Sequence, residues 1–181
     1  WLGEDEYDRV GRAVAGLGDV DGDGLGDLLI GGCWNSSVHY KAGEAYLILG
    51  SAARESGEGS IADADASFTG SAESDYLGRS VGAGGDLDGD GNDSLVLIHG
   101  GTAAWDGREQ ELGALVQTVA RGDLDGDGRE EILLGCGMGR DQRRAPARVW
   151  LLDEQGARMV WEREGARNQI TELLVTDRGV W

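Results

Sequence analysis

The chain has 181 residues, and its 34 acidic and 16 basic side chains give a formal net charge of −18. This acidity argues against a nucleic-acid partner, which requires a basic surface. No apolar stretch approaches the roughly 18–20 residues of a membrane-spanning helix, so we expect no membrane insertion. The 33 glycines and the 40% hydrophobic content favour short strands joined by turns over disorder.

Short apolar runs bounded by glycine and turn residues are typical of strands, and here they predict successive four-stranded units. In the first unit, about residues 7–70, we expect strands at 10–18, 28–30, 44–49 and 66–69. In the second, about 74–112, we expect strands at 77–85, 95–98, 102–105 and 108–112. In the third, about 113–165, we expect strands at 114–122, 132–134, 148–152 and 158–162. Residues 166–181 begin a further unit with a strand at 169–175.

The first and second strands of each unit are joined by the same acidic nine-residue loop, at residues 19–27, 86–94 and 123–131. Each loop has carboxylates at positions 1, 3 and 5, glycines at 4 and 6, a carbonyl at 7 and a side-chain oxygen at 9. Ca²⁺ takes about six to eight such oxygens, and glycine permits the curled backbone that presents them. One copy could be an accidental Asp/Gly turn, but three copies make chance negligible. We therefore expect up to three bound Ca²⁺ ions.

The expected ligands are, in the first loop, Asp19, Asp21, Asp23, the Leu25 carbonyl and Asp27; in the second, Asp86, Asp88, Asp90, the Asn92 carbonyl and Ser94; and in the third, Asp123, Asp125, Asp127, the Arg129 carbonyl and Glu131. Because Ser94 is neutral, we expect the second loop to bind most weakly. Asp93, one place earlier, is the alternative ninth ligand if that loop shifts.

These loops do not fit an EF-hand, which needs a bidentate Glu at position 12 and flanking helices. Position 12 is occupied by Ile30, Leu97 and Leu134. All three lie in short apolar runs that predict buried strands. A calcium sensor is disfavoured as well, since no helix pair that could open is predicted.

Short glycine-containing motifs lie before and after the acidic loops. Val10-Gly11 and Leu77-Gly78 precede the first two, and Gly31-Gly32-Cys33 and Gly135-Cys136-Gly137 follow the strands after the first and third. Over about residues 7–165, this pattern resembles the FG-GAP repeat of integrin-alpha-type β-propellers. The third repeat lacks the first glycine, and no repeat has the family's proline. The resemblance implies an all-β fold of propeller blades, with calcium on one face, away from the usual ligand face. It also implies adhesion or recognition rather than catalysis.

Propellers close with about four to eight blades, whereas three leave open flanks. We therefore expect either an excerpt of a larger propeller or a homo-oligomer that completes the ring. The leading hypothesis is a calcium-stabilised binding module, extracellular or at the cell surface, with a protein or carbohydrate ligand. The alternative is a non-catalytic propeller appendage of a secreted hydrolase or lectin-like protein.

Three further features have ordinary explanations. Ser80 lies in a Gly-x-Ser-x-Gly pattern, but a predicted strand replaces the strand-to-helix turn that the hydrolase elbow needs. We therefore expect no enzyme in this chain. Asn35 begins an N-glycosylation sequence in a turn expected to be exposed. Cys33 and Cys136 are not expected to pair.

Overall fold

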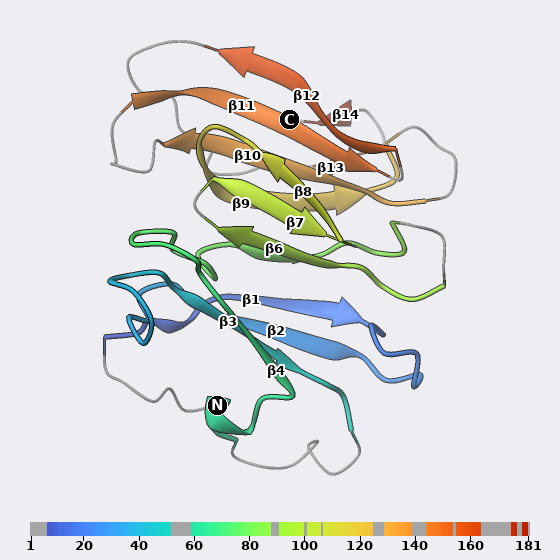
Figure 1. Ribbon diagram of the computed structural model, residues 1–181. Helices are drawn as coiled ribbons and strands as arrows, with labels where there is room; N and C mark the ends of the chain where they lie inside the picture. Colours follow the sequence, from blue (N-terminus) through green and yellow to red (C-terminus); the bar gives the residue numbers. More distant parts are fainter. Residues whose placement is uncertain are drawn as a thin grey trace.

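The computed structural model describes residues 7–51, 59–87, 91–99, 101–105, 107–124, 129–138, 144–153, 155–163, 175–176 and 179–180. The described chain forms three four-stranded antiparallel sheets, which lie one above another (Figure 1). Its one helix is a short 3₁₀ turn, η1 (Ile61–Asp63). No helix among the described residues is long and apolar enough to cross a membrane.

Each sheet follows chain order, so neighbouring strands in the sequence are also neighbours in space. The first sheet contains β1 (Val10–Gly18), β2 (Asp27–Gly32), β3 (Glu44–Ile48) and β4 (Ala66–Thr69). The second contains β5 (Val81–Ala83), β6 (Leu95–His99), β7 (Thr102–Trp105) and β8 (Arg108–Glu111). The third contains β9 (Leu115–Gly122), β10 (Glu131–Met138), β11 (Arg144–Asp153) and β12 (Gly156–Arg163). A two-stranded hairpin, β13 (Val175–Thr176) and β14 (Gly179–Val180), follows.

The all-β fold class is confirmed, and every predicted strand up to residue 163 has a counterpart. The segment predicted as a strand at 77–85 forms a ladder only over Val81–Ala83, with an isolated bridge from Leu77 to Gly43, because Gly78 and Gly85 take positive φ. Residues 169–174, most of the last predicted strand, lie outside the described residues.

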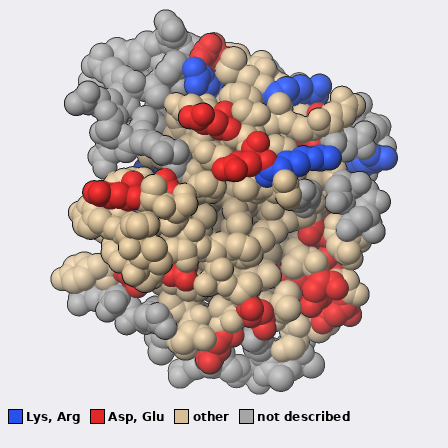
Figure 2. Space-filling model, viewed as in Figure 1, with Lys and Arg blue, Asp and Glu red and all other residues tan. Residues whose placement is uncertain are grey.

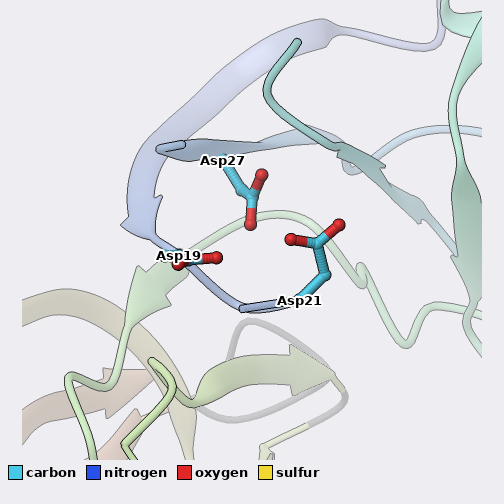
Figure 3. Close-up of side chains that lie close together, drawn as sticks. All are labelled: Asp19, Asp21 and Asp27. Carbon is cyan, nitrogen blue, oxygen red and sulfur yellow. The ribbon is translucent and has the colours of Figure 1, made fainter. Parts of the chain in front are cut away.

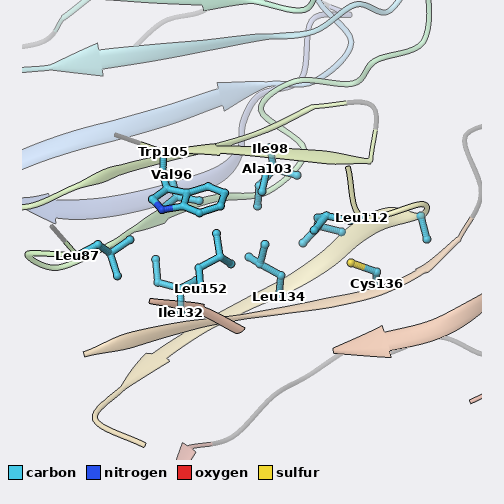
Figure 4. Close-up of a cluster of buried hydrophobic side chains, with 12 residues drawn as sticks. Leu87, Val96, Ile98, Ala103, Trp105, Leu112, Ile132, Leu134, Cys136 and Leu152 are labelled. Atoms are coloured by element: carbon cyan, nitrogen blue, oxygen red, sulfur yellow. The ribbon is translucent and has the colours of Figure 1, made fainter. Parts of the chain in front are cut away.

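The largest apolar cluster lies between the second and third sheets (Figure 4). Trp105 and Val96 of the second sheet meet Ile132 and Leu134 of the third there. Successive side chains of a strand point to opposite faces. Leu133 accordingly belongs to a separate cluster with Val149 and Leu151. The third sheet is therefore apolar on both faces.

A second apolar cluster, around Leu17, Leu29, Ala45, Leu77 and Val81, joins the first and second sheets. The first strands of the units are also neighbours, since β1 contacts β5 and β5 contacts β9. Both cysteines are free and buried, in agreement with the sequence. Burial raises the pKa of Cys136 to about 12, which keeps it a thiol.

Backbone contact between glycines joins the first unit to the second. A Cβ on Gly78 would lie 2.8 Å from the Gly31 Cα and would collide with the Glu44 carbonyl oxygen. Next to it, the Leu77 N–H donates to the Ala42 carbonyl at 2.9 Å. The glycine before the second loop thus packs on the glycines at the end of β2, and close backbone approach explains why neither position carries a side chain.

Gly78→Ala should destabilise the protein more than Gly11→Ala. Both glycines have a φ of +81°, so either alanine carries left-handed strain of about 1–2 kcal/mol. A Cβ on Gly11 meets nothing within 4 Å, whereas one on Gly78 meets backbone. Overpacking should add about 1–3 kcal/mol to the cost at Gly78 alone. Urea unfolding of the two variants measures the difference, and equal costs would contradict the close contact.

Candidate metal centre

The first acidic loop connects β1 to β2, and three of its carboxylates converge. Gly18 pairs with Asp27 at the base of the loop. One oxygen from each of Asp19, Asp21 and Asp27 lies within 4.8 Å of the other two. Figure 3 shows the three side chains directed toward a common space. Figure 2 shows acidic side chains gathered at the edge where this loop lies in Figure 1.

Backbone N–H groups hold Asp19 in place. Its Oδ1 accepts from the Gly22 N–H at 2.7 Å and the Asp23 N–H at 3.0 Å, and its Oδ2 accepts from the Gly24 N–H at 2.8 Å. Gly22 and Gly24 have φ of +80° and +89°, which turns these donors into the loop. The bonds, first that from Gly24, lower the pKa of Asp19. The carboxylate of Asp19 is therefore kept ionised and oriented by the loop backbone itself.

The pKa of Asp21 is shifted in the opposite direction, upward. Desolvation raises its pKa, and the negative charges of Asp23, Asp27 and Asp19 add to the rise. Carboxylates this close repel one another, and a bound cation reverses the effect by favouring their charged forms. The electrostatics of the loop therefore favour occupation by a cation.

Asp27 is the first residue of β2 and is only 4% exposed. Its Oδ2 accepts from the Val20 N–H at 2.8 Å, and its Oδ1 accepts from the Gly50 N–H at 2.7 Å. These two donors come from the start of the loop and from the segment after β3. The ninth residue is thus fixed by the sheet rather than by the loop alone.

In all three loops, the ninth side chain accepts a hydrogen bond from the backbone N–H of the second residue. In the second, the Ser94 Oγ accepts from the Leu87 N–H at 3.2 Å; in the third, the Glu131 Oε2 accepts from the Leu124 N–H at 2.7 Å. Ser94 and Glu131 are 5% and 6% exposed, close to the value for Asp27. The ninth side chains differ in charge but occupy equivalent places, so the loops share one local design.

The first and second loops also share a hydrogen bond in their first turn. The Gly91 N–H donates to the Asp86 Oδ2 at 3.0 Å, as Gly24 does to Asp19 in the first loop. Position 6 therefore binds position 1 in both loops, and the glycine at position 6 has the same role.

The expected ligands have different outcomes. Among the described residues, Asp19, Asp21 and Asp27 form the one group of acids that could hold an ion. Asp23 is not part of this group, and its Oδ1 accepts from the Leu25 N–H at 2.8 Å. Asp88, Asp90, Asp125 and Asp127 lie outside the described residues. The roles of Asp86, Ser94, Asp123 and Glu131, and of the carbonyls of Leu25, Asn92 and Arg129, stay predictions.

Asp93 is not an alternative ninth ligand of its own loop, because it binds the first loop instead. Its N–H donates to the Asp19 carbonyl at 3.0 Å, and its Oδ2 accepts from the Asp19 N–H at 3.0 Å. Glu130, at the same position of the third loop, lies beside Gly85 and pairs with Arg121 at 2.8 Å. Position 8 thus joins the second loop to the first, and in the third loop it lies beside the residue that precedes the second loop. The sequence signal was an acid at position 8 in the second and third loops, where the first has Gly26.

Two other expectations can be compared with the structure. Asn35 is buried rather than exposed, because its Nδ2 donates to the Tyr46 hydroxyl at 3.3 Å and to Asp8 at 3.4 Å. The expectation that Asn35 lies in an exposed turn, accessible to glycosylation, is therefore wrong. Ser80 is buried in a bend just before β5, so the predicted strand does not extend to it, but a strand rather than a helix follows it.

No protein-family model matches the chain, and no curated protein matches it either. The similarity to FG-GAP repeats rests on the residues of this chain alone.

Asp93→Ala should lower the free energy of unfolding by about 1 kcal/mol, a typical net contribution of one hydrogen bond. The substitution removes the acceptor for the Asp19 N–H, whereas Asp93→Asn keeps an oxygen there. Glu73→Ala is the control, since it removes the same charge from an exposed position. Urea unfolding measures the stability of all three variants. A cost for Asp93→Ala no larger than for Glu73→Ala would count against the link between the loops.

Proposed function

We propose that this chain is a calcium-stabilised, non-catalytic binding module of FG-GAP-like propeller blades that acts outside the cell or at its surface. The observation that carries the proposal is the convergence of Asp19, Asp21 and Asp27 in a loop whose closing contact recurs twice. Hard oxygen ligands suit Ca²⁺, which also tolerates irregular coordination. Nitrogen and sulfur ligands, which favour zinc or copper, are absent from this group of acids.

The sheet arrangement supports the blade proposal. Each sheet is a four-stranded meander, each acidic loop joins its first and second strands, and the first strands are neighbours. We assign blades to about residues 7–70, 74–112 and 113–165, with 166–181 beginning another. Three such blades do not make a ring. Further blades, or copies of the chain, would complete the propeller. The ligand would be a protein or a carbohydrate.

Calcium should raise the stability of the protein by mass action. With Kd near ~10⁻⁴ M, ~1 mM Ca²⁺ adds about 1.4 kcal/mol per site. Three sites would contribute roughly 4 kcal/mol of a typical 5–15 kcal/mol. Asp21→Asn should reduce the gain by about a third, because it weakens one loop. Thermal unfolding in Ca²⁺ and in EDTA measures the gain, and an identical Tm in both would overturn the proposal. Affinity in this range also suits a compartment with millimolar calcium.

The three loops should differ in affinity, with the second weakest. Its ninth side chain, Ser94, is neutral, whereas Asp27 and Glu131 are carboxylates in equivalent places. Fewer ligand charges lower calcium affinity. In calorimetric titration, Asp21→Ala should therefore remove a tighter site than Asp88→Ala does. Three equal sites, or the reverse order, would contradict this ranking.

A further inference from the structure

A cavity lined by cations lies at the opposite end of the first sheet from the metal loop. It has a volume of about 190 Å³, and its lining includes Arg9, Arg12, Lys41 and Arg79 around Trp34. These four are a quarter of the 16 basic residues in a chain of net charge −18. Arg12 stands near the start of β1, and the acidic loop follows its end. Arg12 and Asp19 are seven positions apart along an extended strand, roughly 20 Å, so the loop acids are screened from the cavity.

Within the part of the chain that the structure describes, no ion pair neutralises the cations of this cavity. Among the described residues, ion pairs involve His99, Arg121, Arg148 and Arg158, and none joins a carboxylate to the four cavity cations. Two described acids close to these cations along the chain have other hydrogen-bond donors. Asp75 accepts from the Ala72 N–H at 2.7 Å, and Asp8 accepts from the Asn35 Nδ2. The positive field also shows on Cys33, where burial raises the thiol pKa and Arg12, Arg79 and Arg9 oppose the rise.

Trp34 holds two of the cations in place. The Arg9 Cζ lies 3.3 Å from the centroid of its ring, and the Lys41 Nζ lies 4.4 Å from it. Contacts of this kind stabilise cations on an aromatic face. Arg9, Lys41 and Tyr76, which all line this cavity, have positive φ of 54°, 52° and 55°. They are three of the four non-glycine residues with positive φ in the described chain, and such strain concentrates at binding sites.

A larger cavity adjoins the first and shares Arg12 and Arg79 with it. It has a volume of about 430 Å³ and lies where β1, β5 and β9 approach one another. Ser80, Gln117 and Thr118 contribute polar groups to its lining. The Gln117 Oε1 is buried without a hydrogen-bond partner, which is uncommon for a buried polar atom. The two arginines therefore stand between a basic cavity and a polar one.

We propose that this pair of cavities binds a ligand through a carboxylate group, with Arg12 and Arg79 as the anion-binding side chains. The arginine fork matches a carboxylate with two parallel hydrogen bonds, and the adjoining cavity can bond the rest of a polar ligand. A polyanion is disfavoured, because the net charge of −18 repels it outside the cavity. An acidic peptide side chain and a uronic acid both offer the required group. The inference rests on the proposed binding function for its role, but the cavity does not depend on the metal.

Ligand-observed NMR and calorimetry on the full chain test the site with matched pairs of probes. N-acetyl-glutamate N-methylamide is compared with its neutral glutamine analogue, and methyl glucuronoside is compared with methyl glucoside. We expect the charged member of at least one pair to bind saturably and its neutral partner at least about tenfold more weakly. The stronger charged probe identifies a peptide or a saccharide source. Equal binding of charged and neutral partners, or no saturable binding of either charged probe, would overturn the proposal without any variant.

The double variant Arg12→Gln/Arg79→Gln should weaken binding of the charged probe by about tenfold or more. The control Arg108→Gln/Arg158→Gln removes the same charge from exposed positions on β8 and β12 and should leave binding unchanged. Equal loss in both variants would show a general charge effect and refute the assignment. Repeating the titration in EDTA, with circular dichroism to confirm folding, separates the two proposals. If the protein binds the carboxylate probe but not calcium, the calcium proposal is refuted and the cavity proposal stands. If it binds calcium but not the carboxylate probe, only the cavity proposal is refuted.

Discussion

The hydrogen bond between the second backbone N–H and the ninth side chain of each acidic loop is the contact on which the sheets depend. It closes the loop where the first and second strands begin to pair, at Gly18 with Asp27 and at Gly122 with Glu131. A shift of one residue in such a hairpin turns every side chain to the other face. Leu29 and Ile132 would then leave the clusters that join the sheets. The loop geometry therefore fixes the register of the core as well as the position of the acids.

The first two units are joined at both ends of their strands. At one end, backbone packs on backbone where Gly78 meets Gly31, so the separation of the chains is set by the absence of side chains. At the other end, Asp93 exchanges two hydrogen bonds with Asp19. The apolar cluster around Leu17 and Val81 lies between these contacts. Two polar or backbone contacts that flank an apolar cluster orient the sheets more sharply than apolar packing, which is not directional.

Much of the local structure could be predicted from the sequence, because strand runs, glycines and loop acids act over a few residues. The convergence of Asp19, Asp21 and Asp27 follows from spacing within one hairpin. By contrast, the role of Asp93 depends on how two sheets sit relative to each other, and 74 residues separate it from its partner. Asn35 was misjudged because a polar residue in a turn looks exposed unless its buried partner, the Tyr46 hydroxyl, is known. The basic cavity was missed for the same reason, since Arg12, Lys41 and Arg79 come from three separate segments.

The acidic loop and the basic cavity lie at opposite ends of the first sheet, and this separation has a consequence for binding. Acids concentrate at the loop end, and cations surround Trp34 at the other. An approaching anion meets the field of the whole chain before it meets the cavity, and that field is negative. Three bound Ca²⁺ ions would add six positive charges, which changes a formal −18 to −12. Occupied loops would therefore ease the approach of an anion without contact between the sites. Because surface fields decay within about 10 Å at 0.1 M salt, this effect belongs to low ionic strength and to the association rate rather than to the bound state.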